Sequence, residues 1–182
     1  MAAAALAPVL IADSITRVGT DAAGAVVVNG SHGGIYAAYV AAKLGVAAAV
    51  FNDAGVGRDE AGVAGLDYLT SLGIAAAAVG HDTARIGDGE DMMARGRITR
   101  ANAEAMALRC RPGLACRDAV AFLRAAAPSR HEPPSAIEAA FLLIEEAPAL
   151  WALDSASLIG AWQSQALAAS NASTVRSRLG SR

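Results

Sequence analysis

Four short apolar runs separated by helical patterns constrain the fold of this chain more than any other feature. Each run has four to six residues, is rich in Val, Ile or Ala, and is bounded by Gly, Asp or Asn; the runs are 9–12, 25–28, 46–51 and 74–79. Continuous hydrophobicity is typical of strands covered on both faces, as in a parallel α/β sheet. The runs therefore predict an α/β fold with a mainly parallel open sheet.

Two of the segments between these runs have helical patterns. Residues 35–44 are followed by Gly45, and residues 59–72 carry an apolar stripe and are followed by Gly73. Glycine directly after the last helical residue is a common helix stop. This spacing predicts βαβ units in a Rossmann-like, three-layer arrangement. The connection 13–25 lacks a clear helix, so the sequence leaves open whether the first strand is parallel or antiparallel.

The chain after Val79 has a predominantly helical pattern, with proline punctuation. Helices are expected at about 90–95, 100–109, 115–126 and 135–146, and a last strand at about 150–154. We therefore expect one α/β domain over residues 1–162, with a helical C-terminal region at about 90–147. Residues 163–182 have few large apolar side chains and are expected to form a disordered tail.

Two short segments, one near each end of the chain, share a sequence pattern, which we call the internal echo. Residues 12–19 and 153–160 both follow an apolar run, begin with an apolar residue, Asp and Ser, and close with Gly. Two interpretations stay open: chance, or a duplication whose second copy stops after its first strand. A duplication would make the chain a truncated relative of a two-lobed protein, and so a non-catalytic partner subunit.

Composition excludes several classes of protein. With 54% hydrophobic and 18% charged residues, the chain is too apolar to be disordered throughout. Its formal net charge of -2 provides no bulk basic field for nucleic acid or an anionic membrane. No apolar run approaches the ~20 residues of a membrane span. We expect neither nucleic acid nor membrane as a partner; a homo-oligomer stays open.

The N-terminus and the cysteines predict a cytoplasmic protein. The first apolar run lacks a basic region before it and ends at Asp13, so it is interpreted as a strand rather than a signal peptide. Cys110 and Cys116 flank a turn that would sterically permit a bridge. Two reduced thiols are the preferred interpretation, because small domains in oxidising compartments more often carry paired sets of cysteines.

Polar and reactive residue types follow every one of the apolar runs. Ligands of open parallel sheets bind outside the carboxyl ends of the strands, so this edge is the expected site. Capping and turn formation explain the Asp, Asn and Gly residues equally well, but not two of the three histidines at equivalent strand ends. The candidate catalytic residues are Ser31, His32, Asp53 and His81, and the candidate substrate-binding residues are Gly30, Gly33, Gly34, Asn52 and Arg85.

Two glycine-rich loops join strands to helices. The loop 30–34 could offer backbone N–H groups to an anionic or carbonyl oxygen, or Ser31 could simply cap the helix. The loop 55–62 departs from the dinucleotide-binding fingerprint, because its third Gly is misplaced and acidic residues stand where pyrophosphate would approach. Lys43, the only lysine, lacks the neighbours of a phosphate-binding loop. We therefore expect no bound organic cofactor.

Ser, His and Asp at one edge suggest nucleophilic or acid–base chemistry. Ser31 would be the nucleophile, His81 the base, and Asp53 or Asp82 the group that orients the base. The flanking residues lack the nucleophile-elbow spacing. A metal site formed by His32, Asp53 and His81 is chemically conceivable, but no paired-histidine motif supports it, so we expect no metal.

The favoured function is an enzyme acting on a small polar metabolite, a hydrolase or an acid–base enzyme. The main alternative is a domain that binds an anionic ligand without chemistry. In that case Arg85 would clamp a carboxylate or phosphate in its forked geometry, unless it forms a surface ion pair with Asp82 or Asp88. The sequence does not identify the substrate.

Overall fold

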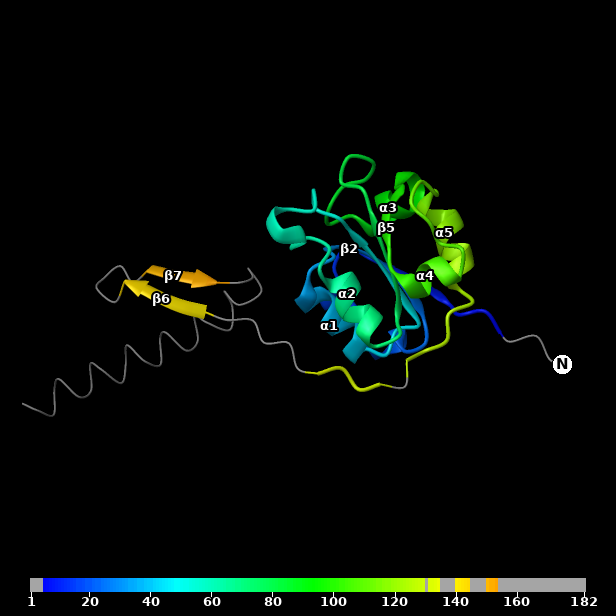
Figure 1. The fold of residues 1–182 in the computed structure, drawn as a ribbon, viewed down its shortest axis with the longest axis horizontal. Coiled ribbons are helices and arrows are strands. Elements are labelled where there is room, and N and C mark those ends of the chain that lie inside the picture. Colours follow the sequence, from blue (N-terminus) through cyan, green and yellow to red (C-terminus); the bar gives the residue numbers. More distant parts are fainter. Residues whose placement is uncertain (1–4, 130, 135–139, 145–149, 154–182) are drawn as a thin grey trace, which may run out of the picture. The chain divides into compact units, whose positions relative to one another are not determined.

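A five-stranded sheet is the centre of the first of two units, 1–136 and 137–182, in the computed structural model (Figure 1). The structure describes residues 5–129, 131–134, 140–144 and 150–153. In spatial order the strands are β1 (Val9–Ala12), β2 (Val26–His32), β3 (Ala48–Asn52), β4 (Ala75–Val79) and β5 (Ile98–Ala101). The first four are parallel and β5 is antiparallel to β4. The predicted mainly parallel α/β sheet is confirmed, and the first strand is parallel.

The central strands are covered on both faces. Along β2, Val26 and Val28 enter one apolar cluster while Val27 enters the other, as the two-residue period of a strand requires. All five residues of β4 are buried although four of them are alanines, a residue with low strand preference. Burial between two helical layers, rather than local propensity, therefore holds β4 in the sheet.

Helices form a layer on each face of the sheet (Figure 1). On one face, α1 (Ile35–Lys43) packs against α2 (Gly65–Ser71); on the other, α3 (Gly89–Arg95) packs against α5 (Cys116–Leu123). The expected stop residues Gly45 and Gly73 both have left-handed backbones, with φ of 71° and 68°. The short helical elements are η1 (Ile15–Arg17), η2 (Thr20–Ala22), η3 (Arg58–Glu60) and α4 (Ala103–Ala107).

The order of the strands follows their order in the sequence. A doubly wound dinucleotide-binding sheet instead reverses direction beside its first strand and binds its ligand at that switch point. The described sheet has no such reversal. The three-layer arrangement is present, but a switch-point crevice cannot position the site, and other features must do so.

The predicted helix at 100–109 begins three residues too early. Residues 98–101 form β5, and the helix begins only after Asn102, whose side chain accepts a hydrogen bond from the N–H of Ala105. The same side chain accepts from the N–H of Ala76 on β4. Pairing with β4 buries Ile98, and this long-range pairing overrides the local helical pattern.

The second unit contains a strand where the sequence predicted a helix. Its described residues are β6 (Ala140–Ile144) and β7 (Leu150–Leu153), which pair antiparallel. The expected helix at 135–146 is therefore wrong over 140–144, and the strand expected near 150–154 is confirmed. A five-residue apolar run does not distinguish the two states by periodicity. The tail 163–182 lies outside the described residues.

The pairing of β7 gives no support to an internal duplication. The first copy of the echo follows β1, which lies in a parallel sheet, whereas the second follows β7, which lies in an antiparallel pair. Equivalent copies of one unit would keep the same strand environment. Residues 154–160 of the echo lie outside the described part of the chain.

Both cysteines are buried in the apolar cluster beneath α5. Burial raises the pKa of the Cys110 thiol to about 11; burial, and to a lesser extent the neighbouring Cys110, raise that of Cys116 to about 12. Because the thiolate is the reactive form of cysteine, neither thiol is a nucleophile at neutral pH. These residues contribute to packing.

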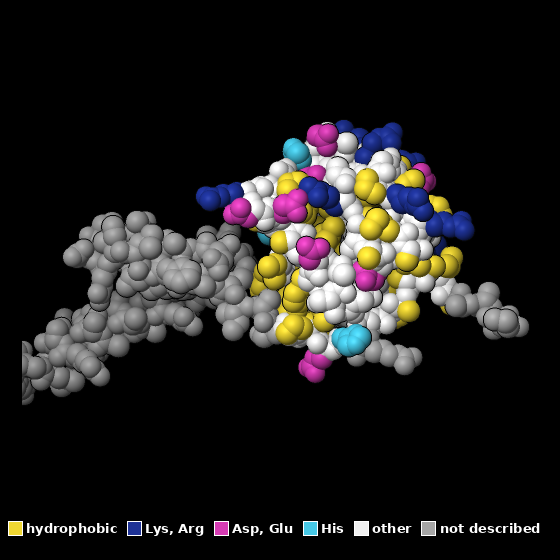
Figure 2. All heavy atoms as spheres, in the orientation of Figure 1, with side chains coloured by type: hydrophobic (Ala, Val, Ile, Leu, Met, Phe, Trp, Pro, Cys, Tyr) yellow, Lys and Arg dark blue, Asp and Glu magenta, His cyan; other side chains and the backbone are white. Residues whose placement is uncertain are grey.

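The exterior of the first unit carries both signs of charge. On the face seen in Figure 2, Lys and Arg side chains, Asp and Glu side chains and apolar side chains all reach the surface. Mixed charge agrees with the overall net charge of -2. Among the residues that the structure describes, no helix is long and apolar enough to cross a membrane.

Gly30 is required by close backbone packing. A Cβ on Gly30 would lie 2.5 Å from the backbone nitrogen of Asp88 and 2.7 Å from the carbonyl oxygen of Asp13. The carbonyl of Gly30 also accepts a hydrogen bond from the N–H of Gly87, at 2.8 Å. We expect Gly30→Ala to lower the free energy of unfolding by about 3 kcal/mol, because backbone cannot move aside as a side chain can.

Urea unfolding checks this prediction against a matched substitution. A Cβ on Gly19 would meet only the exposed carboxylate of Asp21, at 3.0 Å. Gly19→Ala should therefore change stability by less than about 0.5 kcal/mol. Equal effects of the two substitutions would show that the chain does not pack tightly around Gly30.

Candidate functional site

The register of the parallel strands aligns three polar loops along one edge of the sheet. His32 at the end of β2 pairs with Asn52 at the end of β3, and Asn52 pairs with Val79 at the end of β4. The parallel direction of β1 adds Asp13 and Ser14 to the same edge. The loops that follow these strands therefore share one end of the sheet.

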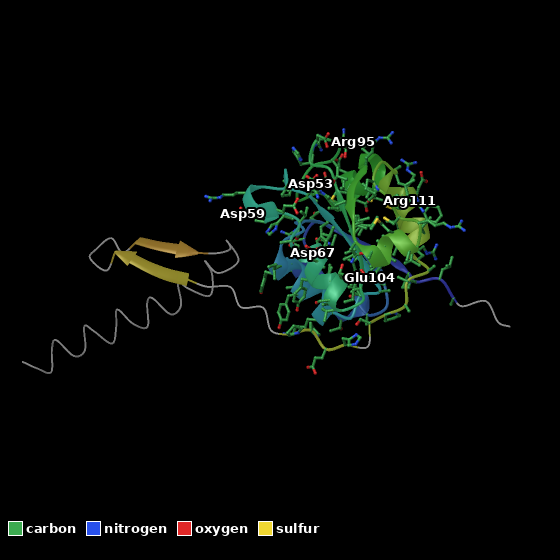
Figure 3. All side chains as sticks on the ribbon, viewed as in Figure 1. Asp53, Asp59, Asp67, Arg95, Glu104 and Arg111 are labelled. Carbon is green, nitrogen blue, oxygen red and sulfur yellow. The ribbon has the colours of Figure 1, made fainter. Side chains whose placement is uncertain are left out.

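Asp53 and His81 form a hydrogen-bonded pair at this edge. Oδ1 of Asp53 lies 2.9 Å from Nδ1 of His81 and also accepts the backbone N–H of His81 at 3.0 Å. Asp53 is only 4% exposed, whereas the side chain of His81 is 57% exposed. Figure 3 shows Asp53 far from Glu104, which lies on α4 toward the other end of the unit. A buried carboxylate thus holds a solvent-facing imidazole.

Four hydrogen bonds keep the Asp53 carboxylate ionised. Burial acts to raise its pKa, but donors from Gly55, His81 and Thr99 outweigh that effect and hold the pKa below its ordinary value. The donors are the N–H groups of Gly55 and His81, the His81 ring and the Thr99 hydroxyl. An ionised carboxylate only accepts hydrogen bonds, so Nδ1 of His81 must carry the proton.

The proton on Nδ1 determines what the other ring nitrogen can do. In a neutral imidazole with a proton on Nδ1, Nε2 has a free lone pair and is the basic atom. Because the His81 ring is more than half exposed, Nε2 can reach water or a ligand. The pair has the geometry of an orienting carboxylate and a general base.

The turn after β3 positions both partners. The N–H of Val56 donates to the carbonyl of Asp53 at 2.7 Å, and the two residues between them, Ala54 and Gly55, have positive φ of 49° and 72°. A Cβ on Gly55 would lie 3.7 Å from the His81 ring, so the turn lies directly beside the imidazole. Val56 also has a positive φ of 65°, which is strained for a β-branched residue. Strain of this kind concentrates at functional sites.

Stability should depend on pH through Asp53. Its folded-state pKa is lowered, so its contribution is complete above the unfolded value of about 3.9 and is lost as pH falls through the folded value. We expect the stability advantage of the wild-type chain over Asp53→Asn to shrink as the pH falls below about 4. Urea unfolding from pH 7 to pH 2 measures this difference, and a pH-independent difference would contradict the prediction.

Ser31 belongs to a different local network. Its hydroxyl accepts the N–H of Ile15 at 3.0 Å and lies 3.4 Å from the Ser14 hydroxyl. Strand β3 separates β2 from β4, so at ~4.8 Å per strand the two backbones lie about 10 Å apart. Among the described residues no hydrogen bond joins Ser31 to His81. The structure pairs Asp53 with His81 and does not bring Ser31 into contact with them.

His32 and the glycine loop are occupied by internal hydrogen bonds. Nδ1 of His32 accepts the N–H of Gly34 at 3.1 Å, and the N–H of Gly33 donates to the carbonyl of Asn52 at 3.0 Å. The N–H of Ser31 donates to the side chain of Asn29 at 3.1 Å. A ligand would have to displace these bonds to use the N–H groups of this loop.

Asn52 and Arg85 also have structural partners. The buried Asn52 side chain donates to the carbonyl of Ala84 and accepts the N–H of Ala54, at 3.2 and 2.9 Å. Arg85 is 72% exposed at its side chain and lies 3.8 Å from the carboxylate of Asp88. Asn52 therefore joins the two loops that carry Asp53 and His81, and Arg85 forms the surface ion pair that the sequence left open.

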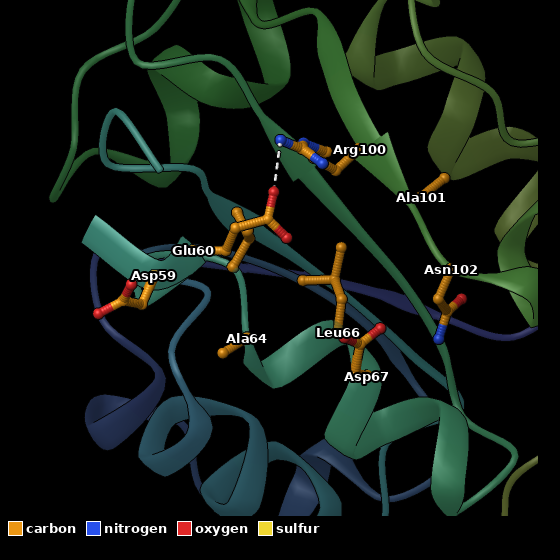
Figure 4. Close-up of a pocket in the computed structure, with 9 residues that line it drawn as sticks. Asp59, Glu60, Ala64, Leu66, Asp67, Arg100, Ala101 and Asn102 are labelled. Atoms are coloured by element: carbon orange, nitrogen blue, oxygen red, sulfur yellow. Dashed lines mark hydrogen bonds and ion pairs between the residues drawn. The ribbon is translucent and has the colours of Figure 1, made fainter. Parts of the chain in front are cut away.

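A pocket of about 260 Å³ lies between α2 and β5 (Figure 4). Its acidic lining residues are Asp59, Glu60 and Asp67, and its single basic residue, Arg100, pairs with Glu60 at 3.1 Å. It therefore carries a net negative charge. Neither Asp53 nor His81 is among its lining residues, but Arg100 directly follows Thr99, whose hydroxyl contacts Asp53. The pocket has room for a small metabolite and favours neutral or cationic groups.

Thr99 is the residue of this site that sequence analysis missed. Its hydroxyl donates to Oδ2 of Asp53 at 2.9 Å. No motif marks it, because the contact depends on the antiparallel pairing of β5 with β4. Among the described residues no group of three His, Cys, Asp or Glu side chains could hold a metal ion.

Comparison of the chain with protein-family models, curated proteins and solved structures finds no match. An α/β sheet by itself hosts many unrelated functions. The functional inference must therefore come from the chemistry of the site.

Proposed function

We propose that this protein is an acid–base enzyme, a hydrolase of small polar metabolites, in which His81 is the general base. One observation carries the proposal: the buried Asp53 carboxylate accepts a hydrogen bond from Nδ1 of an imidazole that is 57% exposed. In Asp–His pairs of this geometry the carboxylate holds the imidazole in one tautomer and orientation and stabilises the imidazolium that forms during the reaction.

Water is the nucleophile that fits the geometry. Nε2 of His81 removes a proton as the water oxygen attacks a carbonyl carbon, and the carbonyl bond opens to an oxyanion. The oxyanion then re-forms the carbonyl as the bond to the leaving group breaks, and the imidazolium gives its proton to that group, so that the acid product is released and the base is regenerated. Ser31 is left out of this scheme because its hydroxyl accepts the N–H of Ile15 and no described hydrogen bond joins it to His81.

The surroundings favour catalysis over anion binding. Backbone N–H groups of Ser31, Gly33 and Gly34 already have acceptors. The pocket beside β5 carries three carboxylates and one paired arginine, which disfavours an anionic ligand. We therefore infer neutral or cationic substrates rather than phosphates or dicarboxylates.

A panel of small esters, amides and lactams tests the proposal, with neutral, cationic and anionic members of equal size. We expect turnover of at least one neutral or cationic member, with anionic counterparts slower because of a higher KM. The heat-unfolded chain provides the background rate. Hydrolysis at the same rate by the folded and unfolded chains would contradict the proposal.

A further inference from the structure

Strand β5 contains an extra residue opposite the end of β4. Ala78 pairs with Arg100 and Val79 pairs with Ile98, so Thr99 has no partner on β4. Two residues of β5 span one step of β4, which is the definition of a β-bulge. Bulges bend a strand and redirect one side chain, and they are enriched beside active sites.

The bulge directs Thr99 at Asp53. Without an extra residue, side chains on β5 would alternate strictly between the two faces. Ile98 enters the core cluster of one face, and Arg100 reaches Glu60 in the loop after β3. The intervening Thr99 places its hydroxyl 2.9 Å from Oδ2 of Asp53 and 3.3 Å from the carbonyl of Ala78.

Gly80 makes room for this arrangement. A Cβ on Gly80 would lie 2.8 Å from Cγ2 of Thr99, so the missing side chain lets the threonine methyl group lie against the chain next to His81. The contact therefore joins β5 to the segment that carries the base.

The two oxygens of Asp53 have separate functions. Oδ1 accepts from the N–H of Gly55 and from the backbone N–H and ring Nδ1 of His81, whereas Oδ2 accepts from Thr99 alone among the described residues. A carboxylate with one unsatisfied oxygen could rotate about its Cβ–Cγ bond and weaken the bond to the imidazole. The Thr99 hydroxyl fixes that rotation.

We infer that Thr99 is a positioning residue, which orients the Asp53 carboxylate and thereby the His81 base through a β-bulge hydrogen bond. The inference rests on the proposed function for its catalytic consequence, and on the described geometry for the hydrogen bond itself. Among the described residues, His81 is the titratable side chain hydrogen-bonded to Asp53.

Thr99→Val and Thr99→Ser test this inference together. Valine keeps the β-branched shape and removes the hydroxyl, while serine keeps the hydroxyl and removes the methyl group. The ¹³C resonance of the Asp53 carboxyl, followed from pH 7 to pH 2, reports its protonation. In Thr99→Val we expect the titration midpoint to rise by about one pH unit, because a bond to the ionised form is lost. In Thr99→Ser it should stay near the wild-type value.

Activity provides the second readout. We expect kcat on the best substrate of the panel to fall about tenfold in Thr99→Val, because a rotated Asp53 carboxylate would hold the His81 base in a less productive orientation. KM should change little. Thr99→Ser should recover kcat to within about twofold. Unchanged midpoints in both variants, or equal shifts in both, would overturn the inference, because neither pattern follows the hydroxyl.

The nuclear magnetic resonance spectrum of the His81 ring in the wild-type chain separates the two proposals. If Nδ1 carries the proton and Thr99→Val leaves the Asp53 midpoint unchanged, the positioning role is wrong and the proposed base stands. If Nε2 carries the proton, the proposed base is wrong. The Asp53 midpoints in the two Thr99 variants still decide whether the hydroxyl bond exists.

Discussion

Replacing His81 with Gln is expected to lower kcat by about 10²- to 10⁴-fold. Glutamine preserves some hydrogen bonding but cannot accept a proton from water at neutral pH. Because general-base catalysis acts in the transition state, KM should change little. Stability should also change little, since the His81 side chain is more than half exposed. Steady-state kinetics and urea unfolding measure these two effects separately.

His131→Gln is the matched control for this substitution. His131 is exposed. In the described part of the chain its backbone N–H donates a hydrogen bond to the hydroxyl of Ser129 at 3.1 Å. The same chemical change there should leave kcat within about twofold of wild type. Normal turnover by His81→Gln would show that His81 is not the base.

Replacing Asp53 with Asn is expected to lower kcat by about 10³- to 10⁴-fold, as in hydrolases that lose the carboxylate behind their base. An asparagine amide can donate to Nδ1 of His81, and this favours the ring form with its proton on Nε2. The base then has no free lone pair facing the solvent. The rate loss therefore exceeds what the removal of one hydrogen bond would cause.

The same substitution should also destabilise the fold, by about 1–3 kcal/mol at pH 7. The carboxylate is 4% exposed and its four donors come from three different segments. Kinetics should therefore be measured at a temperature where circular dichroism shows the variant to be folded. A folded Asp53→Asn variant with wild-type kcat would contradict the role assigned to Asp53.

Local sequence patterns predict most of the sheet because its central strands are buried on both faces. The runs at 25–28, 46–51 and 74–79 overlap β2, β3 and β4, and the glycines after α1 and α2 stop those helices. Burial on both faces leaves a signal that each strand carries by itself. Long-range pairing leaves no such signal, so the sequence predicts residues 100–101 of β5 as the start of a helix.

The candidate site was predictable only to the level of its edge. Parallel strands bring their carboxyl ends together, and this places Asp53 and His81 at one end of the sheet. Which partners meet depends on side-chain geometry: Asp53 bonds to His81, while Ser31 bonds to Ile15. The Thr99 contact depends on one bulged residue in an antiparallel edge strand, and sequence spacing contains no signal for that.

The position of the proton on the His81 ring tests the central claim most directly, because it requires no substrate. Two-bond ¹H–¹⁵N spectra at about pH 8.5, where imidazoles are mostly neutral, distinguish the two forms. We expect His81 to carry its proton on Nδ1, held by Asp53, and His32 to carry its proton on Nε2, because its Nδ1 accepts from Gly34. A His81 ring protonated on Nε2 would contradict the account, since the nitrogen that faces the solvent could not then act as a base.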